Sequence, residues 1–260
     1  RVYDPCIWKE NEGYYSLSGT YIDGELFVDS KVVQHLFFST NLDNWVYKGP
    51  FMIDGFYTDP GEDGAVPYFW PLGGYHILLF ASHLRGAQYL IGNYDRINMK
   101  FNPLKHGRFN FGRIMHGGVH APTATIDDQG RLIVIFNINE AKPTEGWDQV
   151  MSVPRVLSIR DDMTLNMEPV PELSLLHDEL KLVDEVVIPA NVELILDEVG
   201  GKAIEIEAVF DPRDAREFGL NVMRSPDGDE MTKVAVYRKG LMSASKDHHE
   251  DVLVLDTSRS

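Results

Sequence analysis

Two adjacent carboxylates, Glu62 and Asp63, precede a glycine and an apolar, proline-centred run in the stretch EDGAVPYFWPLG. Carboxyl groups held close together at the start of a buried strand can transfer protons, because neighbouring negative charges raise the pKa of one of them. A Glu-Asp-Gly sequence is also an ordinary solvated turn. The stretch alone leaves both interpretations open.

Asp4, the Glu62–Asp63 pair and His120 each stand shortly before a proline. Carboxylates and an imidazole gathered at one pocket suit proton transfer and the binding of hydroxyl groups. Each residue also has a structural alternative. Asp before Pro commonly starts a turn, and an isolated His commonly serves as a hydrogen-bonding group in the fold. Only a fold that brings these residues together would favour the chemical interpretation.

The prolines belong to three similar segments. Each segment has a short β-prone run, a Gly-bearing turn seven or eight residues after the proline, and then a strongly apolar strand. Prolines 5, 67 and 122 give periods of 62 and 55 residues. The segments are DPCIWKENEGYYSLSG from Asp4, VPYFWPLGGYHILLFA from Val66 and APTATIDDQGRLIVIFN from Ala121.

A unit of about four strands that recurs at this spacing predicts a β-propeller, because one blade alone cannot bury both of its faces. A generic meander of β-hairpins is the alternative. In a propeller the innermost strand of each blade lines a central channel, so residues 4, 62–63 and 120 should converge at one mouth. Three blades do not close a ring, since propellers have about four to eight blades. We therefore expect further blades outside this sequence.

The composition changes after Pro169, where PVPELSLLHDEL predicts an acidic connector. Beyond it, AIEIEAVF (residues 203–210) alternates with period two, as a strand with one buried face should. Several such segments separated by turns suggest a β-sandwich. The predicted fold is all-β, with propeller blades over residues 1–170, a linker over 171–185 and an incomplete sandwich over 186–260.

The 260 residues carry a net charge of −16. Nucleic acid and anionic membrane surfaces both require Lys and Arg, so both are disfavoured as partners, whereas a neutral sugar is tolerated. No apolar run approaches the length of a membrane span. Cys6 is the only cysteine, which excludes an intrachain disulfide and leaves the compartment open. His248 and His249 lack a second pair of metal ligands, so we expect a solvated turn there, no metal and no cofactor.

Four stretches, in order, resemble glycoside hydrolase family 32, the group of invertases, fructanases and levanases. VYDPCIW resembles the family's Arg-Asp-Pro motif, and VPYFWPLG its Glu-Cys-Pro-Asp-Phe-Phe-Pro-Leu region. GGVHAPTAT resembles the Tyr-Ala-Pro strand, and GWDQVMSVPRVLSI the closing strand Gly-Trp-x-x-x-Met-Ser-x-Pro-Arg-Glu-Leu. The resemblance implies a five-bladed propeller with a C-terminal β-sandwich, of which this chain would hold the last three blades.

The resemblance further implies retaining hydrolysis of a fructofuranosyl bond in an oligo- or polysaccharide. Asp4 matches the aspartate that stabilises the transition state. Tyr3 and His120 occupy the slots of the family's arginine and tyrosine, and Trp147 is a candidate pocket wall, so these three are expected to bind substrate. The family's nucleophile belongs to an Asn-Asp-Pro-Asn motif that does not occur in this sequence. We therefore expect the chain alone to be inactive.

Ala65 occupies the slot of the family's acid glutamate and cannot transfer a proton. One interpretation is that Glu62 or Asp63 replaces it, with a β-bulge at Gly64 re-aiming the side chain. Glu62 is preferred for its reach and residue type, while strand parity puts Asp63 on the same face as residue 65. The alternatives are a propeller that binds carbohydrate without catalysis, and another five-bladed glycosidase such as an arabinanase.

Overall fold

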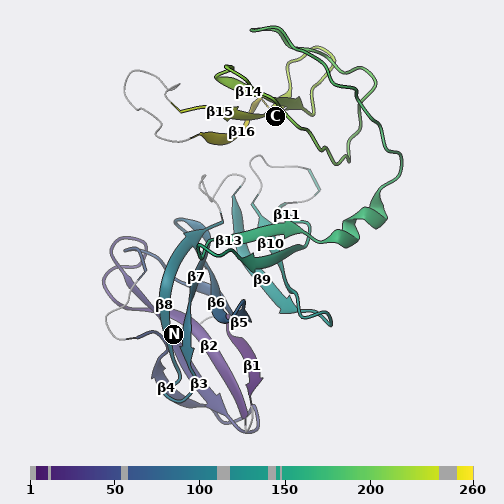
Figure 1. Cartoon of the computed structure of the whole chain (residues 1–260). Helices are drawn as coiled ribbons and strands as arrows, with labels where there is room; N and C mark the ends of the chain where they lie inside the picture. The colour runs from purple at the N-terminus through teal and green to yellow at the C-terminus, as the bar shows by residue number, and fades with distance from the viewer. Residues whose placement is uncertain are drawn as a thin grey trace. The chain divides into compact units, whose positions relative to one another are not determined.

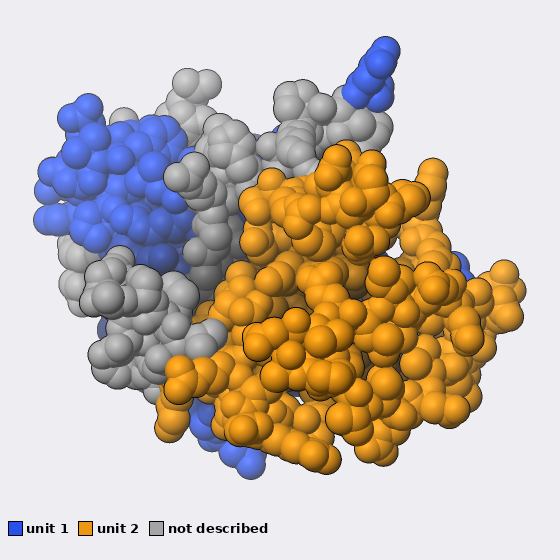
Figure 2. Space-filling view, turned by 90° about the horizontal axis from the view of Figure 1, so that it is seen from above, with its two compact units in different colours: residues 1–176 blue, residues 177–260 orange. Residues whose placement is uncertain are grey.

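The computed structural model describes residues 4–10, 13–53, 58–109, 118–139, 145–146, 148–239 and 251–259. The chain forms two compact units, residues 1–176 and residues 177–260, which Figure 2 colours separately. Nearly all the regular structure is β-strand, as the sequence predicts. Among the described residues no helix has the length and apolar character needed to span a membrane.

The first unit begins with two antiparallel sheets of four strands, each strand paired with its neighbours in chain order (Figure 1). We call them blade 1 and blade 2. Blade 1 contains β1 (Cys6–Glu10), β2 (Gly13–Asp23), β3 (Lys31–Ser39) and β4 (Val46–Pro50). Blade 2 contains β5 (Ala65–Leu72), β6 (Tyr75–Ser82), β7 (Gly86–Asp95) and β8 (Lys100–Arg108). This up-and-down order is the one expected of propeller blades.

Blade 3 follows the same plan with an interrupted third strand. Its strands are β9 (Val119–Ile126), β10 (Leu132–Ile138), β11 (Val150–Met151), β12 (Arg155–Ile159) and β13 (Leu165–Pro169). β9 pairs with one edge of β10, while β11 and β12 share its other edge. Blade 3 is therefore also a four-stranded meander, in which β11 and β12 together take the place of the third strand. A 3-10 helix, η1 (Pro171–Leu176), ends the first unit.

The residue before each repeated proline has a left-handed backbone. Asp4, Val66 and Ala121 have φ values of 47°, 46° and 42°. Such values are uncommon outside glycine and strained for a β-branched residue such as Val66. Finding the same unusual conformation at the same position in three blades confirms the phase of the sequence repeat.

Two apolar clusters hold the blades together. Strand β6 belongs to both, because Leu78 and Phe80 point into one cluster and Ile77 and Leu79 into the other. The first cluster joins blades 1 and 2 and contains Cys6, Leu17, Leu36, Phe51, Met52, Phe69, Leu78, Phe80, Leu90 and Phe101. The second joins blades 2 and 3 and contains Ile77, Leu79, Ala87, Ile91, Ala124, Leu132, Val134, Phe136 and Leu157. Blade 2 is thus buried on both faces.

The described residues of the second unit, taken by itself, form one three-stranded sheet. Its strands, β14 (Glu217–Val222), β15 (Met231–Tyr237) and β16 (Val252–Arg259), pair in chain order. The boundary between the units falls inside the predicted linker 171–185. A sandwich needs a second sheet, so the sandwich stays a prediction.

The strand predicted over residues 203–210 is wrong. The segment has no strand conformation and its residues are exposed, including Val209 at 93%. A period-two pattern becomes a strand only where a neighbouring strand supplies hydrogen bonds. None of the strands in the described residues pairs with this segment.

Candidate active site

The EDG stretch is fixed to blade 1 through its backbone. Ser30 Oγ donates a hydrogen bond to the Glu62 carbonyl at 3.0 Å, and Gln34 Nε2 donates to the Gly64 carbonyl at 3.1 Å. The Gly64 carbonyl also lies against the backbone of Gly19, where an added Cβ would stand 2.0 Å from the carbonyl oxygen. The stretch is therefore a packed connection between two blades.

The predicted bulge lies further along the strand than Gly64. Gly64 has a φ of +59°, but the register of β5 with β6 shifts between Ala65 and Tyr68. The irregular backbone is thus centred on Val66 and the following proline, where the left-handed residue interrupts the ladder.

The Glu62 side chain is fully buried, with 0% exposure. Gln88 Nε2 donates to Glu62 Oε1 at 2.5 Å, and Arg85 Nη1 lies 3.6 Å from the same oxygen. Glu62 Oε2 has no hydrogen-bond partner within the described part of the chain. Burial raises the pKa of Glu62, and the contacts with Gln88 and Arg85 only partly oppose this effect. The folded protein therefore favours the protonated carboxyl.

We expect Glu62→Gln to stabilise the protein at about pH 8 and to have little effect at about pH 4. The folded-state pKa of Glu62 is raised, so ionising this group destabilises the fold as the pH rises above its unfolded-state pKa. Glutamine is neutral at every pH and keeps the acceptor for Gln88. Urea denaturation at several pH values measures the difference.

Glu172→Gln is the matched control, with the opposite sign. Arg131 lowers the pKa of Glu172, so that its stabilising contribution is present at neutral pH and is lost as the pH falls through the lowered pKa. A stability difference between wild type and Glu62→Gln that stayed constant with pH would contradict the assigned pKa shift.

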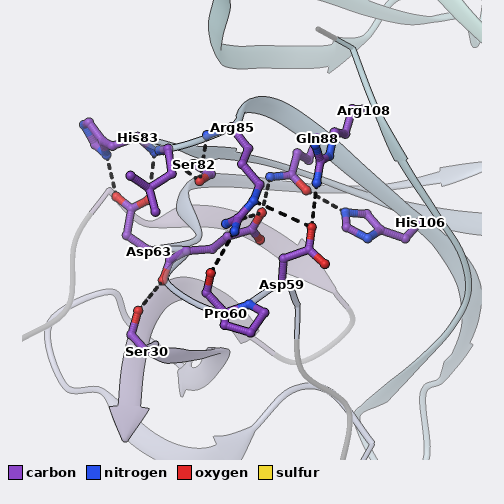
Figure 3. Close-up of polar contacts among 12 residues, drawn as sticks. Ser30, Asp59, Pro60, Asp63, Ser82, His83, Arg85, Gln88, His106 and Arg108 are labelled. Carbon is purple, nitrogen blue, oxygen red and sulfur yellow. Dashed lines mark hydrogen bonds and ion pairs between the residues drawn. The ribbon is translucent and has the colours of Figure 1, made fainter. Parts of the chain in front are cut away.

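A second ionic group lies further out on blade 2 (Figure 3). Asp59 pairs with Arg108 at 2.6 Å and with Arg85 at 3.8 Å, and His106 Nε2 donates to Gln88 Oε1 at 2.6 Å. A hollow of about 300 Å³ opens there and is lined by Asp59, His106, Gly107 and Arg108. It lies at the outermost strand of the blade, β8, and is distinct from the mouth predicted at the inner strands.

Asp63 is held by His83, as Figure 3 shows. The His83 backbone N–H donates to Asp63 Oδ1 at 3.0 Å, and His83 Nδ1 lies 2.5 Å from Asp63 Oδ2. A carboxylate only accepts, which assigns the Nδ1 proton to His83. The His83 ring packs against the His120 ring with 5.1 Å between centroids. His83 therefore contacts both Asp63, two residues before β5, and His120 of β9.

The environment of His120 favours the neutral imidazole. Burial lowers the pKa of His120, the neighbouring His83 ring lowers it further, and Asp63 acts in the opposite direction. Its Nε2 is buried and has no hydrogen-bond partner among the described residues. A neutral ring can accept or donate one hydrogen bond to a hydroxyl group.

The remaining predicted residues are less informative. Asp4 is exposed, and within the described residues no hydrogen bond joins it to Glu62, Asp63 or His120. Tyr3 and Trp147 lie outside the residues that the structure describes, as do His248 and His249.

His83 was missed by the sequence analysis. Ala65 pairs with Ala81, so extending this register by two residues places Asp63 opposite His83. The signal available was an acid and an imidazole at the two ends of a predicted hairpin, nine residues before Leu72 and eight residues after Tyr75. The pairing becomes specific only once the register is known. Chemically, a carboxylate that holds an exposed imidazole is an arrangement for proton transfer.

Comparison with known proteins identifies the family of this chain. Residues 1–169 match the model of the glycosyl hydrolases family 32 N-terminal domain. A sucrose-6-phosphate hydrolase of Staphylococcus xylosus is 24% identical over 190 residues, which is 67% of this chain and 36% of the relative. A sucrose-6-phosphate hydrolase of Zymomonas mobilis is 26% identical over 243 residues, covering 87% and 47%.

The fold agrees as well. The solved structure of a sucrose-6-phosphate hydrolase from Lactobacillus gasseri superposes with a TM-score of 0.61 at 17% identity, covering 98% of this chain and 55% of that one. The chain spans less than half the length of the curated relatives it matches. The family match covers well over half of the chain, so this chain belongs to glycosyl hydrolase family 32.

Proposed function

We propose that the protein is a glycosidase that hydrolyses fructofuranosyl bonds in oligo- or polysaccharides with retention of configuration, and that this chain supplies part of its sugar pocket. Support comes from membership of family 32 and from relatives that are named sucrose-6-phosphate hydrolase. The observation that carries the proposal is the group Asp63–His83–His120, which gathers two predicted site residues at the start of two inner strands.

The roles proposed for the carboxylates follow their accessibility. Asp4 is exposed and is proposed to stabilise the oxocarbenium-like transition state. The Asp63 side chain is 15% exposed, whereas that of Glu62 is 0% exposed. A group that exchanges protons with a substrate must reach it or contact a group that does, so we place the acid/base function at Asp63 and the accessible side chain that it contacts, and not at Glu62. The nucleophile is proposed to be a carboxylate from another part of the full-length protein.

The test is hydrolysis of sucrose by the full-length protein, followed as released fructose, with arabinosides assayed in parallel. We expect fructose release by wild type and a loss of about 100-fold in kcat/KM for Asp63→Asn. Asp128→Asn, on an exposed turn, is the matched control and should keep wild-type activity. A larger loss for Glu62→Gln than for Asp63→Asn would move the acid to Glu62. Hydrolysis of arabinosides alone would overturn the substrate assignment.

A protein that binds carbohydrate without catalysis is the second candidate, because Ala65 stands in the slot of the family's acid. It predicts measurable affinity of the full-length protein for fructosides with no product released. Calorimetric titration with sucrose, alongside the activity assay, separates the two candidates.

A further inference from the structure

The contacts of Asp63 leave it poorly suited to donate a proton itself. Both of its carboxylate oxygens interact with His83, one with the backbone N–H and the other with ring Nδ1. Its side chain is only 15% exposed. A carboxylate held in this way stays an acceptor, and its effect is to fix the tautomer and the orientation of the imidazole.

The imidazole that Asp63 holds is accessible. The His83 side chain is 54% exposed. Its Nδ1 is occupied by Asp63, and in the described residues no hydrogen bond or ion pair involves its Nε2. The ring is also fixed in place, because it packs edge-on against Phe27 at 5.9 Å and against His120 at 5.1 Å. One nitrogen is therefore fixed and the other is free to meet a ligand.

His83 lies close to residue 65, the position at which this chain lacks the acid residue of the family. Ala65 pairs with Ala81 across β5 and β6, and His83 is two residues beyond Ala81 at the same end of the blade. We propose that His83 Nε2 is the acid/base of the sugar site and that Asp63 is its positioning residue. This inference rests on the proposed fructosidase function.

The proton movements balance over the two steps of a retaining reaction. In the first step, protonated His83 gives its Nε2 proton to the glycosidic oxygen as the bond from that oxygen to the fructosyl carbon breaks, and the bonding electrons stay on the oxygen. The fructosyl carbon bonds to the carboxylate nucleophile. In the second step, neutral His83 takes a proton from the attacking water, and the carboxylate leaves.

The groups that face His83 suit this cycle. Asp63 is the carboxylate in contact with the ring, with Oδ2 at 2.5 Å from Nδ1. His120, on β9, also packs against the ring, and burial lowers the pKa of His120, which disfavours a second positive charge beside His83. Phe27 also packs against the His83 ring and carries no charge.

The test compares His83→Asn with wild type in the full-length protein on two substrates. Sucrose needs a proton on its leaving oxygen, whereas the fluoride of a fructosyl fluoride departs without one. We expect His83→Asn to lower kcat/KM for sucrose by about 100-fold or more and for the fluoride by less than about fivefold. The alkaline limb of the wild-type profile for sucrose, where imidazolium is lost, should disappear in the variant.

His177→Asn is the matched control, because His177 is also exposed and also bonded to a carboxylate, that of Glu205, at 2.9 Å. It should leave both activities unchanged. Sucrose hydrolysis by His83→Asn within about threefold of wild type would overturn the inference while the proposed function stands. Equal loss on both substrates would place His83 in folding or binding and would also overturn it. Failure of wild type to act on either substrate would instead remove the proposed function, and the inference with it.

Discussion

Replacing Phe51 by alanine is expected to lower the free energy of unfolding by about 3–5 kcal/mol. Phe51 is fully buried between blades 1 and 2. Its ring centroid lies 4.9 Å from that of Phe69, 5.6 Å from that of Tyr94 and 6.0 Å from that of Phe101. The substitution removes these contacts and leaves a cavity that a rigid β-sheet cannot close.

The backbone around Phe51 makes this cavity costly. Phe51 N–H donates to the Gln34 carbonyl at 2.7 Å, and Phe101 N–H donates to the Phe51 carbonyl at 2.8 Å. These bonds tie residue 51 to both blades and prevent it from moving into the space. Urea denaturation should give a smaller loss for Phe51→Leu, and Ile97→Ala, at a side chain 90% exposed, should change stability by less than about 0.5 kcal/mol. A loss below about 1 kcal/mol for Phe51→Ala would contradict the assigned packing.

Gly19→Ala is expected to destabilise the protein by about 3 kcal/mol and, in the full-length protein, to slow the proposed hydrolysis as well. The added Cβ would stand 2.0 Å from the Gly64 carbonyl oxygen and 2.8 Å from its carbon. Both atoms are backbone, so no side chain can turn aside. The steric clash can be relieved only if the EDG stretch moves away from blade 1. This movement breaks the hydrogen bond from Gln34 and shifts Asp63.

Gly200→Ala is the control for the Gly19 substitution. Gly200 has no heavy atom within 4 Å of a built Cβ, and it has no positive φ. The pair of variants separates steric contact from the general effect of replacing glycine. Gly19→Ala with wild-type stability would show that blades 1 and 2 approach less closely than described.

The sequence was most informative where periodicity decides the structure. The repeated prolines predicted three strand units with the correct phase, and Asp4, Val66 and Ala121 share one backbone conformation. The unbroken apolar run of β6 has the form of a strand buried on both faces, and the structure buries both of its faces. Trp8 and Trp70 stand three residues after the repeated prolines at 5 and 67, and both lie against the apolar clusters.

The site was less predictable because its contacts join distant residues. The burial of Glu62 depends on Arg85 and Gln88, which are 23 and 26 residues further along the chain. His83 meets Asp63 through a cross-strand register, which a single sequence specifies only loosely. Residues 203–210 illustrate the opposite error, where a local strand pattern found no pairing partner in the described structure.

The left-handed residue before each repeated proline also bears on how such a site can evolve. Blades that share this backbone conformation at the same position can present the neighbouring side chains in equivalent directions. A mutation that erases a reactive group from one blade can then be compensated by a residue change on the facing hairpin, without rebuilding the main chain. Ala65 beside Asp63 and His83 is the pattern that this kind of replacement would leave in a lineage.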